Sequence, residues 1–319
     1  MKAATKQSTR VEYGKTLALL GQENPDIVVL DADLSGSTQT HLFAQAFPER
    51  FFNMGIAEQD MMGTAAGLAV AGKIPFASTF AIFATGRAWE QIRQSIAYGD
   101  LNVKIVASHG GITVGEDGGS HQGLEDLALM RVLPNMVVLV PADGPETRAM
   151  VRWAAAYRGP VYIRTSRQPF PVLFEEDTYR FELGQGQILQ EGRDVTLAGC
   201  GLMVHYCLEA ARMLAAEGLE ARVLNLSCIK PLDWELVVDS ARLTGALVAA
   251  EEHMVTGGLG SAISEVLTEF YPAPLQRVGI RDVFGLSGKP ENLLKHFGLT
   301  PDDIKNAALK AVARKKNGK

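Results

Sequence analysis

The chain has 319 residues, of which 47% are hydrophobic and 21% charged, so it is long enough for two globular domains. Its formal net charge of −5 gives no reason to expect nucleic acid or an anionic membrane as a partner. No apolar stretch is long enough to span a bilayer, and the N-terminus lacks the apolar region of a signal peptide. The 3 cysteines lack metal-ligand and C-x-x-C spacing, which favours reduced thiols and a cytoplasmic location.

Apolar, β-branched runs alternate with amphipathic segments in the first half of the chain. The predicted strands are 26–32, 75–80, 103–108, 136–141 and 160–165. Helices are predicted between them, for example over 58–71, 84–98 and 145–157. Continuous apolar strands separated by helices indicate a parallel sheet that is covered on both faces.

The alternation stops after the fifth strand and resumes later. The segment 166–187 contains two prolines, scattered aromatic residues and no period. Further apolar strands are predicted at 195–201, 221–227, 246–252 and 276–280. The expected fold class is therefore α/β, with domains over 1–170 and 188–319 joined by a linker over 171–187, and each domain a mostly parallel sheet covered by helices.

Chemically active side chains follow several of the predicted strands. They are Asp33, Phe80, Phe83, His109 and Arg167. In open parallel sheets, ligands bind beyond the carboxyl ends of the strands. Ordinary turns there would hold small residues and caps, so this collection of rings and charges is better explained by a site.

A glycine-rich segment, "GITVGEDGGSHQG" over 111–123, follows the third strand. Its glycines let the backbone approach a ligand closely, and it contains Asp117 and His121. A lone loop histidine is commonly solvated or a cap. Because His109 and His121 bracket this segment, the pattern also suits proton transfer or binding of a hydroxyl.

The chain does not match the common nucleotide-binding motifs or the nucleophile elbow. Ile74 stands where a P-loop over 67–74 would need Ser or Thr, and Ile263 takes the third glycine position of a dinucleotide fingerprint. Gln122 stands where a nucleophile elbow around Ser120 would need glycine. No cysteine and histidine set has zinc spacing.

Other candidates have two interpretations from the residues alone. Glu58 opens a helix of small and apolar residues, where an acid suits the helix dipole or acts as a carboxyl with a raised pKa. Phe80 and Phe83 suit a core or a cofactor platform. Arg10 and Arg167, with Ser37 nearby, suit an exposed surface or a clamp for an anionic ligand.

Seven segments of the chain resemble transketolases in order and spacing. "DADLSGSTQT", "FFNMGIAEQD", "PFASTFAIF", "SHGGITVGEDGGSHQG" and "LPNMVVLVPAD" are similar to the pyrimidine-binding domain of that family. "CIKPLDWELV" and "LVAAEEHMVTGGLGSAISEVL" are similar to its C-terminal domain. The resemblance covers nearly the whole chain and implies a thiamine-diphosphate-dependent enzyme.

The resemblance assigns cofactor roles to four residues. Glu58 in "GIAEQ" matches the carboxyl that bonds the pyrimidine nitrogen and favours the reactive imino form. Phe83 matches the aromatic ring that stacks on the pyrimidine, and Phe80 lines the same pocket. Asp33 matches an acid near the thiazolium. The hard chemistry belongs to the cofactor, which the protein orients.

The resemblance also assigns substrate roles. The residues that match groups gripping the phosphate of a sugar are Arg10, Ser37, His109 and Arg167. Asp117 matches the residue that bonds a sugar hydroxyl, and His121 matches the one that meets the reacting oxygens. The catalytic residues implied are thus Glu58, His121 and His109.

One departure from the family concerns the metal. Family members bind the diphosphate through Mg²⁺ held by a G-D-G motif and a later Asn, and this chain contains no G-D-G. The resemblance therefore implies no metal ligands on this chain. It implies a separate N-terminal subunit that carries the motif, an α2β2 assembly, and a cofactor bound between the chains.

The activity implied is transfer of a two-carbon ketol unit from a ketose phosphate to an aldose phosphate, as in the pentose phosphate pathway. Deoxyxylulose-phosphate synthase and the β-subunit of a 2-oxo-acid dehydrogenase are alternatives that share parts of the pattern. His109 favours transketolase, because a sugar-phosphate donor needs that extra polar contact. A non-catalytic assembly paralogue is a further alternative, which the retained site residues disfavour.

Overall fold

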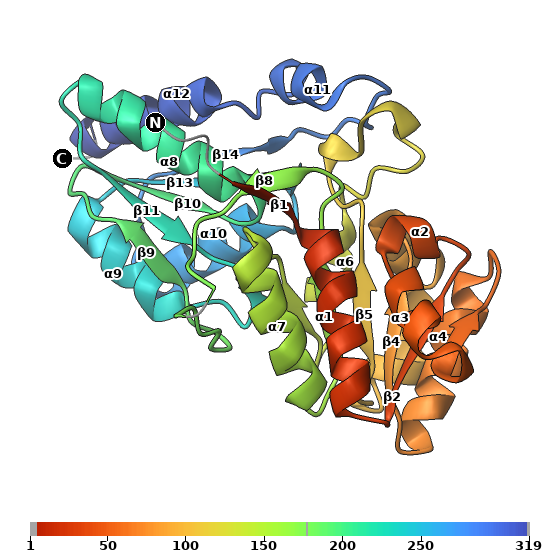
Figure 1. Ribbon diagram of the computed structural model, residues 1–319. Helices are drawn as coiled ribbons and strands as arrows, with labels where there is room; N and C mark the ends of the chain where they lie inside the picture. Colours follow the sequence, from red (N-terminus) through yellow and green to blue (C-terminus); the bar gives the residue numbers. More distant parts are fainter. Residues whose placement is uncertain (1–4, 177, 318–319) are drawn as a thin grey trace.

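The computed structural model describes residues 5–176 and 178–317, and two sheets form its centre (Figure 1). The larger sheet has the strand order β12-β6-β7-β5-β4-β2-β3. Its strands are β2 (Ile27–Asp31), β3 (Phe51–Asn53), β4 (Ile74–Ser78), β5 (Lys104–Ala107), β6 (Val137–Leu139), β7 (Val161–Arg164) and β12 (Cys228–Lys230). All neighbours in it are parallel except β12, which runs antiparallel to β6. The five predicted strands of the first half are confirmed, with ends that differ by one or two residues.

Helices cover both faces of the larger sheet. The elements packed around it are α1 (Thr9–Glu23), α2 (Ser35–Thr38), α3 (His41–Ala46), the 3₁₀ turn Pro48–Arg50, α4 (Glu58–Val70), α6 (Asp126–Arg131) and α7 (Gly144–Ala156). Side chains of α1, α3 and α7 share one core cluster with the sheet, and those of α4 and α6 lie in another. Helix α7 begins where the Asp143 carboxylate accepts from the Glu146 backbone N–H at 2.9 Å, and Pro145 fits its first turn.

The smaller sheet has the order β14-β13-β10-β11-β9, and only β9 is antiparallel to its neighbour. Its strands are β9 (Gln187–Gln190), β10 (Val195–Gly199), β11 (Ala221–Asn225), β13 (Leu247–Met254) and β14 (Leu275–Ile280). The surrounding helices are α8 (Leu202–Ala216), α9 (Trp234–Thr244), α10 (Leu259–Phe270), α11 (Pro290–His296) and α12 (Pro301–Asn317). Both predicted mostly parallel sheets are therefore confirmed.

Three of the strands that the sequence analysis did not predict lie where the two halves meet. β1 (Lys6–Ser8) pairs antiparallel with β8 (Pro169–Pro171) at their junction. The short β12 comes from the second half of the chain, yet it forms the edge of the larger sheet. The segment 172–186 between β8 and β9 has no helix or strand among its described residues.

The predicted helical stretch over 84–98 is confirmed, but it is interrupted and not regular. Two wide π-helical turns, Phe83–Arg87 and Ile92–Ala97, flank the short helix α5 (Trp89–Gln91). The break falls at Ala88, which has φ −108° and ψ 19°, directly after Gly86 and Arg87. Such π turns are uncommon and often lie at functional sites.

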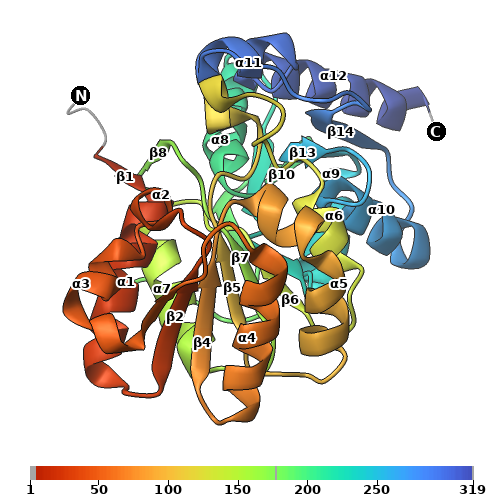
Figure 2. The ribbon, with the colours of Figure 1, turned by 90° about the vertical axis from the view of Figure 1, so that its right-hand side faces the viewer.

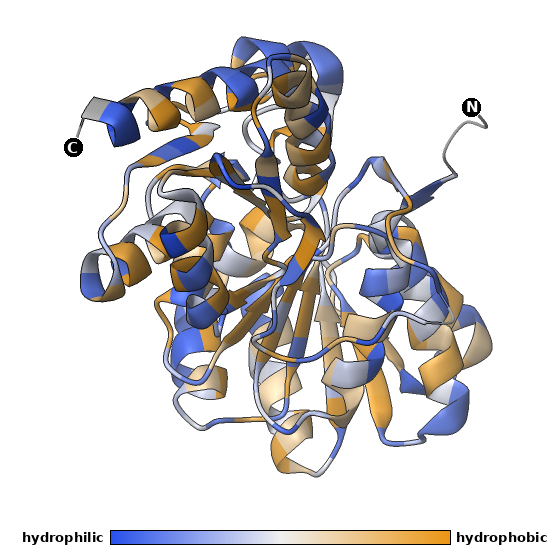
Figure 3. Cartoon of the chain, turned by 90° about the vertical axis from the view of Figure 1, so that its left-hand side faces the viewer, coloured by the Kyte–Doolittle hydropathy of each residue, from blue (hydrophilic) through white to orange (hydrophobic). Residues whose placement is uncertain are grey.

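One hydrophobic cluster extends through both sheets. It contains side chains of α4 and α6, which cover the larger sheet, and side chains of α9 and α10, which cover the smaller one. Figure 3 shows the strands mostly in the hydrophobic colour and the outer helices mixed. At about 25 cal/mol per Å² of buried apolar surface, this shared core favours one folded unit. Within the described residues, no helix has the length and apolarity that a membrane span needs.

Candidate active site

Most of the predicted site residues follow the carboxyl ends of β2, β4, β5 and β7, which are neighbours in the larger sheet (Figure 2). Arg10, in α1, and Glu58, which opens α4 after β3, come from other elements. Beyond these ends an isolated parallel bridge joins Phe80 to Ser108. Asp33 and His109 have positive φ, 62° and 59°, which Asp and His tolerate better than most residues. The backbone therefore turns sharply at this edge and brings the side chains together.

Four rings gather at the edge. The His109 ring stacks on Phe80 with centroids 3.8 Å apart and planes at 17°. Phe80 in turn lies parallel to Phe83, with centroids 5.8 Å apart. His121, from the glycine-rich segment, meets Phe83 edge-on at 5.4 Å and Phe80 at 6.1 Å. The two phenylalanines and the two histidines thus form one cluster, as the prediction of a common site requires.

Arg87 links Glu58 to the same ring cluster. Its carboxylate, 1% exposed at the start of α4, accepts from Arg87 Nη1 at 2.8 and 2.9 Å. The Arg87 guanidinium also lies over the Phe83 ring, 4.6 Å from its centroid. The sequence analysis missed Arg87, although its place four residues after Phe83 in a helical segment is the spacing of side chains that meet.

Positive side chains surround His109. Burial, followed by the charges of Arg10, Arg167 and His121, lowers the pKa of the His109 ring to about 3. Burial and the charge of Arg167 also lower the pKa of Arg10. His109 is therefore neutral at physiological pH, and the arginines around it favour an anion.

The Arg10 side chain contacts the backbone of Ser37. Arg10 Nη1 donates to the Ser37 carbonyl at 2.7 Å, while the Arg10 Nε is buried with no hydrogen-bond partner among the described residues. The turn that carries Ser37 is held by the buried Asp31, whose carboxylate accepts from Thr38 Oγ1 at 2.6 Å and from the Leu34 N–H at 2.6 Å. Burial raises the pKa of Asp31, and these donors oppose the rise.

The glycine-rich segment forms a kinked 3₁₀ turn over Ile112–Asp117. Arg167 Nη1 donates to the Val114 carbonyl and lies 3.5 Å from Asp117 Oδ2 and 3.9 Å from Glu116 Oε2. In Figure 1 this segment is the yellow loop that reaches to α11. Ser287 Oγ, just before α11, donates to the Glu116 carbonyl at 2.6 Å. The C-terminal half therefore supports the loop that presents Asp117 and His121.

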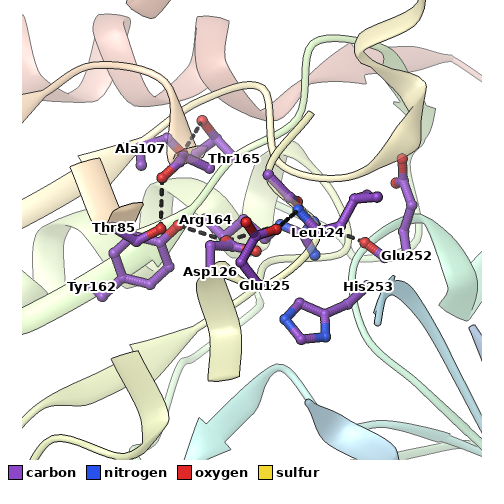
Figure 4. Close-up of polar contacts among 12 residues, drawn as sticks. Thr85, Ala107, Leu124, Glu125, Asp126, Tyr162, Arg164, Thr165, Glu252 and His253 are labelled. Atoms are coloured by element: carbon purple, nitrogen blue, oxygen red, sulfur yellow. Dashed lines mark hydrogen bonds and ion pairs between the residues drawn. The ribbon is translucent and has the colours of Figure 1, made fainter. Parts of the chain in front are cut away.

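Beneath this loop lies a buried ionic cluster (Figure 4). Arg164 Nε lies 3.2 Å from Asp126 Oδ2, which also accepts from the Tyr162 hydroxyl at 2.6 Å. Arg164 Nη2 donates to the Glu252 carbonyl at 2.8 Å, and the Glu252 carboxylate accepts from the Thr113 N–H at 2.5 Å. Adjacent acids in the apolar strand 246–252 were the available signal for this cluster, but sequence reasoning did not single them out.

Asp33 is the predicted residue that lies least closely with the others. Its exposed side chain accepts from Asn53 Nδ2 at 3.0 Å rather than from a member of the ring cluster. Asp33 is nevertheless on the turn after β2, beside the strand that leads to Phe80. A role near the cofactor's thiazolium stays a prediction for this residue.

Comparison with known proteins identifies the family. The family model "Transketolase, pyrimidine binding domain" matches residues 5–172, and "Transketolase, C-terminal domain" matches residues 184–304. The chain belongs to the transketolase family. The predicted family and fold are thus confirmed.

Several transketolase relatives match this chain along most of both lengths. A "Putative transketolase C-terminal section" of Methanocaldococcus jannaschii is 50% identical over 92% of this chain and 93% of its own. A "6-deoxy-6-sulfo-D-fructose transketolase subunit" of a Clostridium species is 45% identical over 96% and 95%. A solved "Split gene transketolase, inactive beta4 tetramer" is 60% identical, with a TM-score of 0.90, over 97% of this chain and 99% of that one.

The residues of this transketolase chain fit the pyrimidine part of thiamine diphosphate. A buried carboxylate and a half-buried aromatic ring, Glu58 and Phe83, already share one planar N–H cation. An aminopyrimidine that is protonated or in its imino form offers the same chemistry, a flat ring with N–H donors. For Mg²⁺, the described residues contain no group of three or more His, Cys, Asp or Glu side chains that could hold a metal ion.

Proposed function

We propose that this chain is the C-terminal subunit of a two-chain transketolase, which moves a ketol unit from a ketose phosphate to an aldose phosphate with thiamine diphosphate. The contact that carries the proposal is the shared binding of one planar cation by Glu58 and Phe83, beside the ring cluster. When bound, the cofactor supplies the carbon nucleophile that accepts the ketol unit. The chain's own residues orient it and bind the sugar.

Glu58 would hold the pyrimidine. Its carboxylate is shielded from water, so a hydrogen bond that it accepts from a ring N–H there is stronger than it would be in solvent. Phe83, half-buried and parallel to Phe80, would support the flat face of that ring. The two interactions together would fix both the position and the tautomer of the pyrimidine.

The histidines would act on the sugar. His109 Nδ1 is 2.9 Å from Ser108 Oγ, which leaves Nε2 for a substrate oxygen, and the ring stays neutral at physiological pH. His121 Nδ1 is 3.0 Å from Ser120 Oγ, and its ring touches both phenylalanines, so it would lie nearest the reacting carbon. We assign His121 the movement of protons at the reacting oxygens.

The phosphate would lie among the cations. Arg10 with its unpartnered Nε, Arg167, and the Ser37 turn surround His109, and guanidinium groups suit the geometry of phosphate oxygens. Asp117, on the loop that Arg167 supports, would accept a hydrogen bond from a sugar hydroxyl. Because one relative is named for a sulfonated sugar, the same clamp would suit a sulfonate.

A second chain would complete the site. We assign the diphosphate and Mg²⁺ to an N-terminal subunit with the G-D-G motif, in an α2β2 assembly. Two facts support this assignment: near-full-length relatives are named as sections or subunits, and the β4 tetramer of one of them is described as inactive. The buried free thiols Cys200, Cys207 and Cys228 support a cytoplasmic location.

The decisive experiment is a ketol-transfer assay of the assembled chains with thiamine diphosphate and Mg²⁺. Glu58→Gln keeps the shape of the side chain but removes its charge, so we expect activity at least ~100-fold lower with the assembly intact. The control is Glu49→Gln, an exposed acid 68% accessible on a surface turn. Unchanged turnover in Glu58→Gln would refute the proposed role.

The donor substrate that supports turnover distinguishes a transketolase from the alternative activities. We expect turnover with a ketose phosphate or with 6-deoxy-6-sulfo-D-fructose, and none with pyruvate. Turnover with pyruvate alone would favour a synthase or a 2-oxo-acid dehydrogenase subunit. Absence of turnover with every donor, in an intact assembly that binds the cofactor, would favour a non-catalytic paralogue.

A further inference from the structure

Arg87 binds both groups that the proposed function reserves for the pyrimidine. Its Nη1 donates to the two oxygens of Glu58, and its Cζ lies 4.6 Å from the centre of the Phe83 ring. The Arg87 side chain is 48% exposed, whereas Glu58 is 1% exposed. One arginine therefore occupies the carboxylate and the aromatic ring together from the solvent side.

The guanidinium and a protonated aminopyrimidine present similar chemistry. Both are planar, both carry N–H donors that suit a carboxylate, and both are attracted to the face of an aromatic ring. While Arg87 contacts Glu58 and Phe83, neither group is available to a second planar ligand. Binding of the pyrimidine and the ion pair of Glu58 with Arg87 therefore compete.

We propose that Arg87 is a placeholder, which holds Glu58 and Phe83 while the cofactor is absent and swings into solvent when the pyrimidine binds. This inference rests on the proposed function. Without a partner, the buried Glu58 carboxylate would be an unpaired charge, which is strongly unfavourable in a protein interior. Arg87 supplies that partner in the empty chain.

The local backbone lets the side chain leave while the main chain stays. The Arg87 carbonyl accepts from Gln59 Nε2 at 3.2 Å, which fixes the backbone to α4. The preceding Gly86 is exposed and adds no side chain to block the movement. Because nearly half of the Arg87 side chain is already in water, its release needs little further rearrangement.

The test is calorimetric binding of thiamine diphosphate to the two-chain assembly with Mg²⁺. If Arg87 competes with the pyrimidine, Arg87→Ala should bind the cofactor about two- to fivefold more tightly, the upper part of the range expected of a partly exposed ion pair. Arg87→Lys keeps the charge but loses the planar fork, so its affinity should lie between the two. The matched control is Arg93→Ala, whose guanidinium bonds the exposed Gln94 instead of Glu58.

A ligand without the pyrimidine shows which part of the cofactor competes. The thiazole diphosphate fragment should bind Arg87→Ala and the wild type equally. Unchanged or weaker binding of thiamine diphosphate by Arg87→Ala, with circular dichroism and assembly size as in the wild type, would overturn the placeholder. If the wild-type assembly binds no thiamine diphosphate, the proposed function itself fails, and the placeholder fails with it.

Discussion

At the scale of single residues, the environment of His109 decides its chemistry more than its identity does. Burial and three neighbouring cationic or basic side chains, Arg10, Arg167 and His121, lower the pKa of its ring to about 3. A loop histidine that is exposed would titrate near neutral pH. His109 instead stays neutral, so it forms hydrogen bonds without a change of charge.

The lowered pKa of His109 makes the free energy of unfolding depend on pH. Between about pH 6.5 and pH 3 the unfolded chain protonates His109 and the folded chain does not, so the free energy of unfolding falls as the pH falls through this window. We expect His109→Asn, in which Asn tolerates the positive φ, to lose about 3 kcal/mol less of its free energy of unfolding than the wild type between pH 6.5 and 4. Urea titrations across this range measure it, and parallel curves for the two proteins would contradict it.

At the scale of elements, the glycine-rich segment depends on partners far along the chain. Gly111 has φ +87°, and a side chain there would collide with the Glu252 carboxyl, while the Thr113 N–H bonds that carboxyl at 2.5 Å. At the other end, Ser287 holds the Glu116 carbonyl. Contacts with the second half of the chain thus hold the glycine-rich segment in place at both ends.

Gly111→Ala tests that support. The new methyl group adds a strained φ and displaces the buried Glu252, so we expect the free energy of unfolding to fall by about 2 kcal/mol or more. Gly36→Ala is the control, because Gly36 is exposed and has open space around its Cβ position. Denaturant unfolding of both variants measures the difference, and equal effects at the two glycines would show that the segment is not held in this way.

At the scale of the whole molecule, the two sheets form one body. One hydrophobic cluster contains helices from both sides, β12 of the second half completes the larger sheet, and Arg164 of the first half bonds Glu252 of the second. Removing either half would expose apolar surface and leave buried charges without partners.

The chain should therefore unfold in one cooperative transition. Variants that keep only Trp153, in α7, or only Trp234, in α9, report on the two halves separately. We expect their fluorescence midpoints in urea to coincide within error, because neither half keeps a complete core alone. Two separated midpoints would show that the halves fold independently.

The sequence by itself determined the α/β class, the five strands of the first half and the edge at which the chemically active side chains gather. These depend on local periodicity and on the rule that parallel strands end at one edge. Sequence motifs also identified the family. The sequence did not predict the break at Ala88 or the π-helical turns on either side of it, since one glycine within an apolar helical pattern rarely interrupts a helix.

Only the tertiary structure decided which side chains meet across the chain. Arg87 lies 29 residues from Glu58, and Thr113 lies 139 residues from Glu252, so no local pattern records either contact. The pairing of β12 with β6 is also distant in the sequence, since Cys228 pairs with Leu139. Hydrogen bonds and ion pairs of this kind form because a buried charged or polar group is unfavourable without a partner, and burial is a property of the packed molecule.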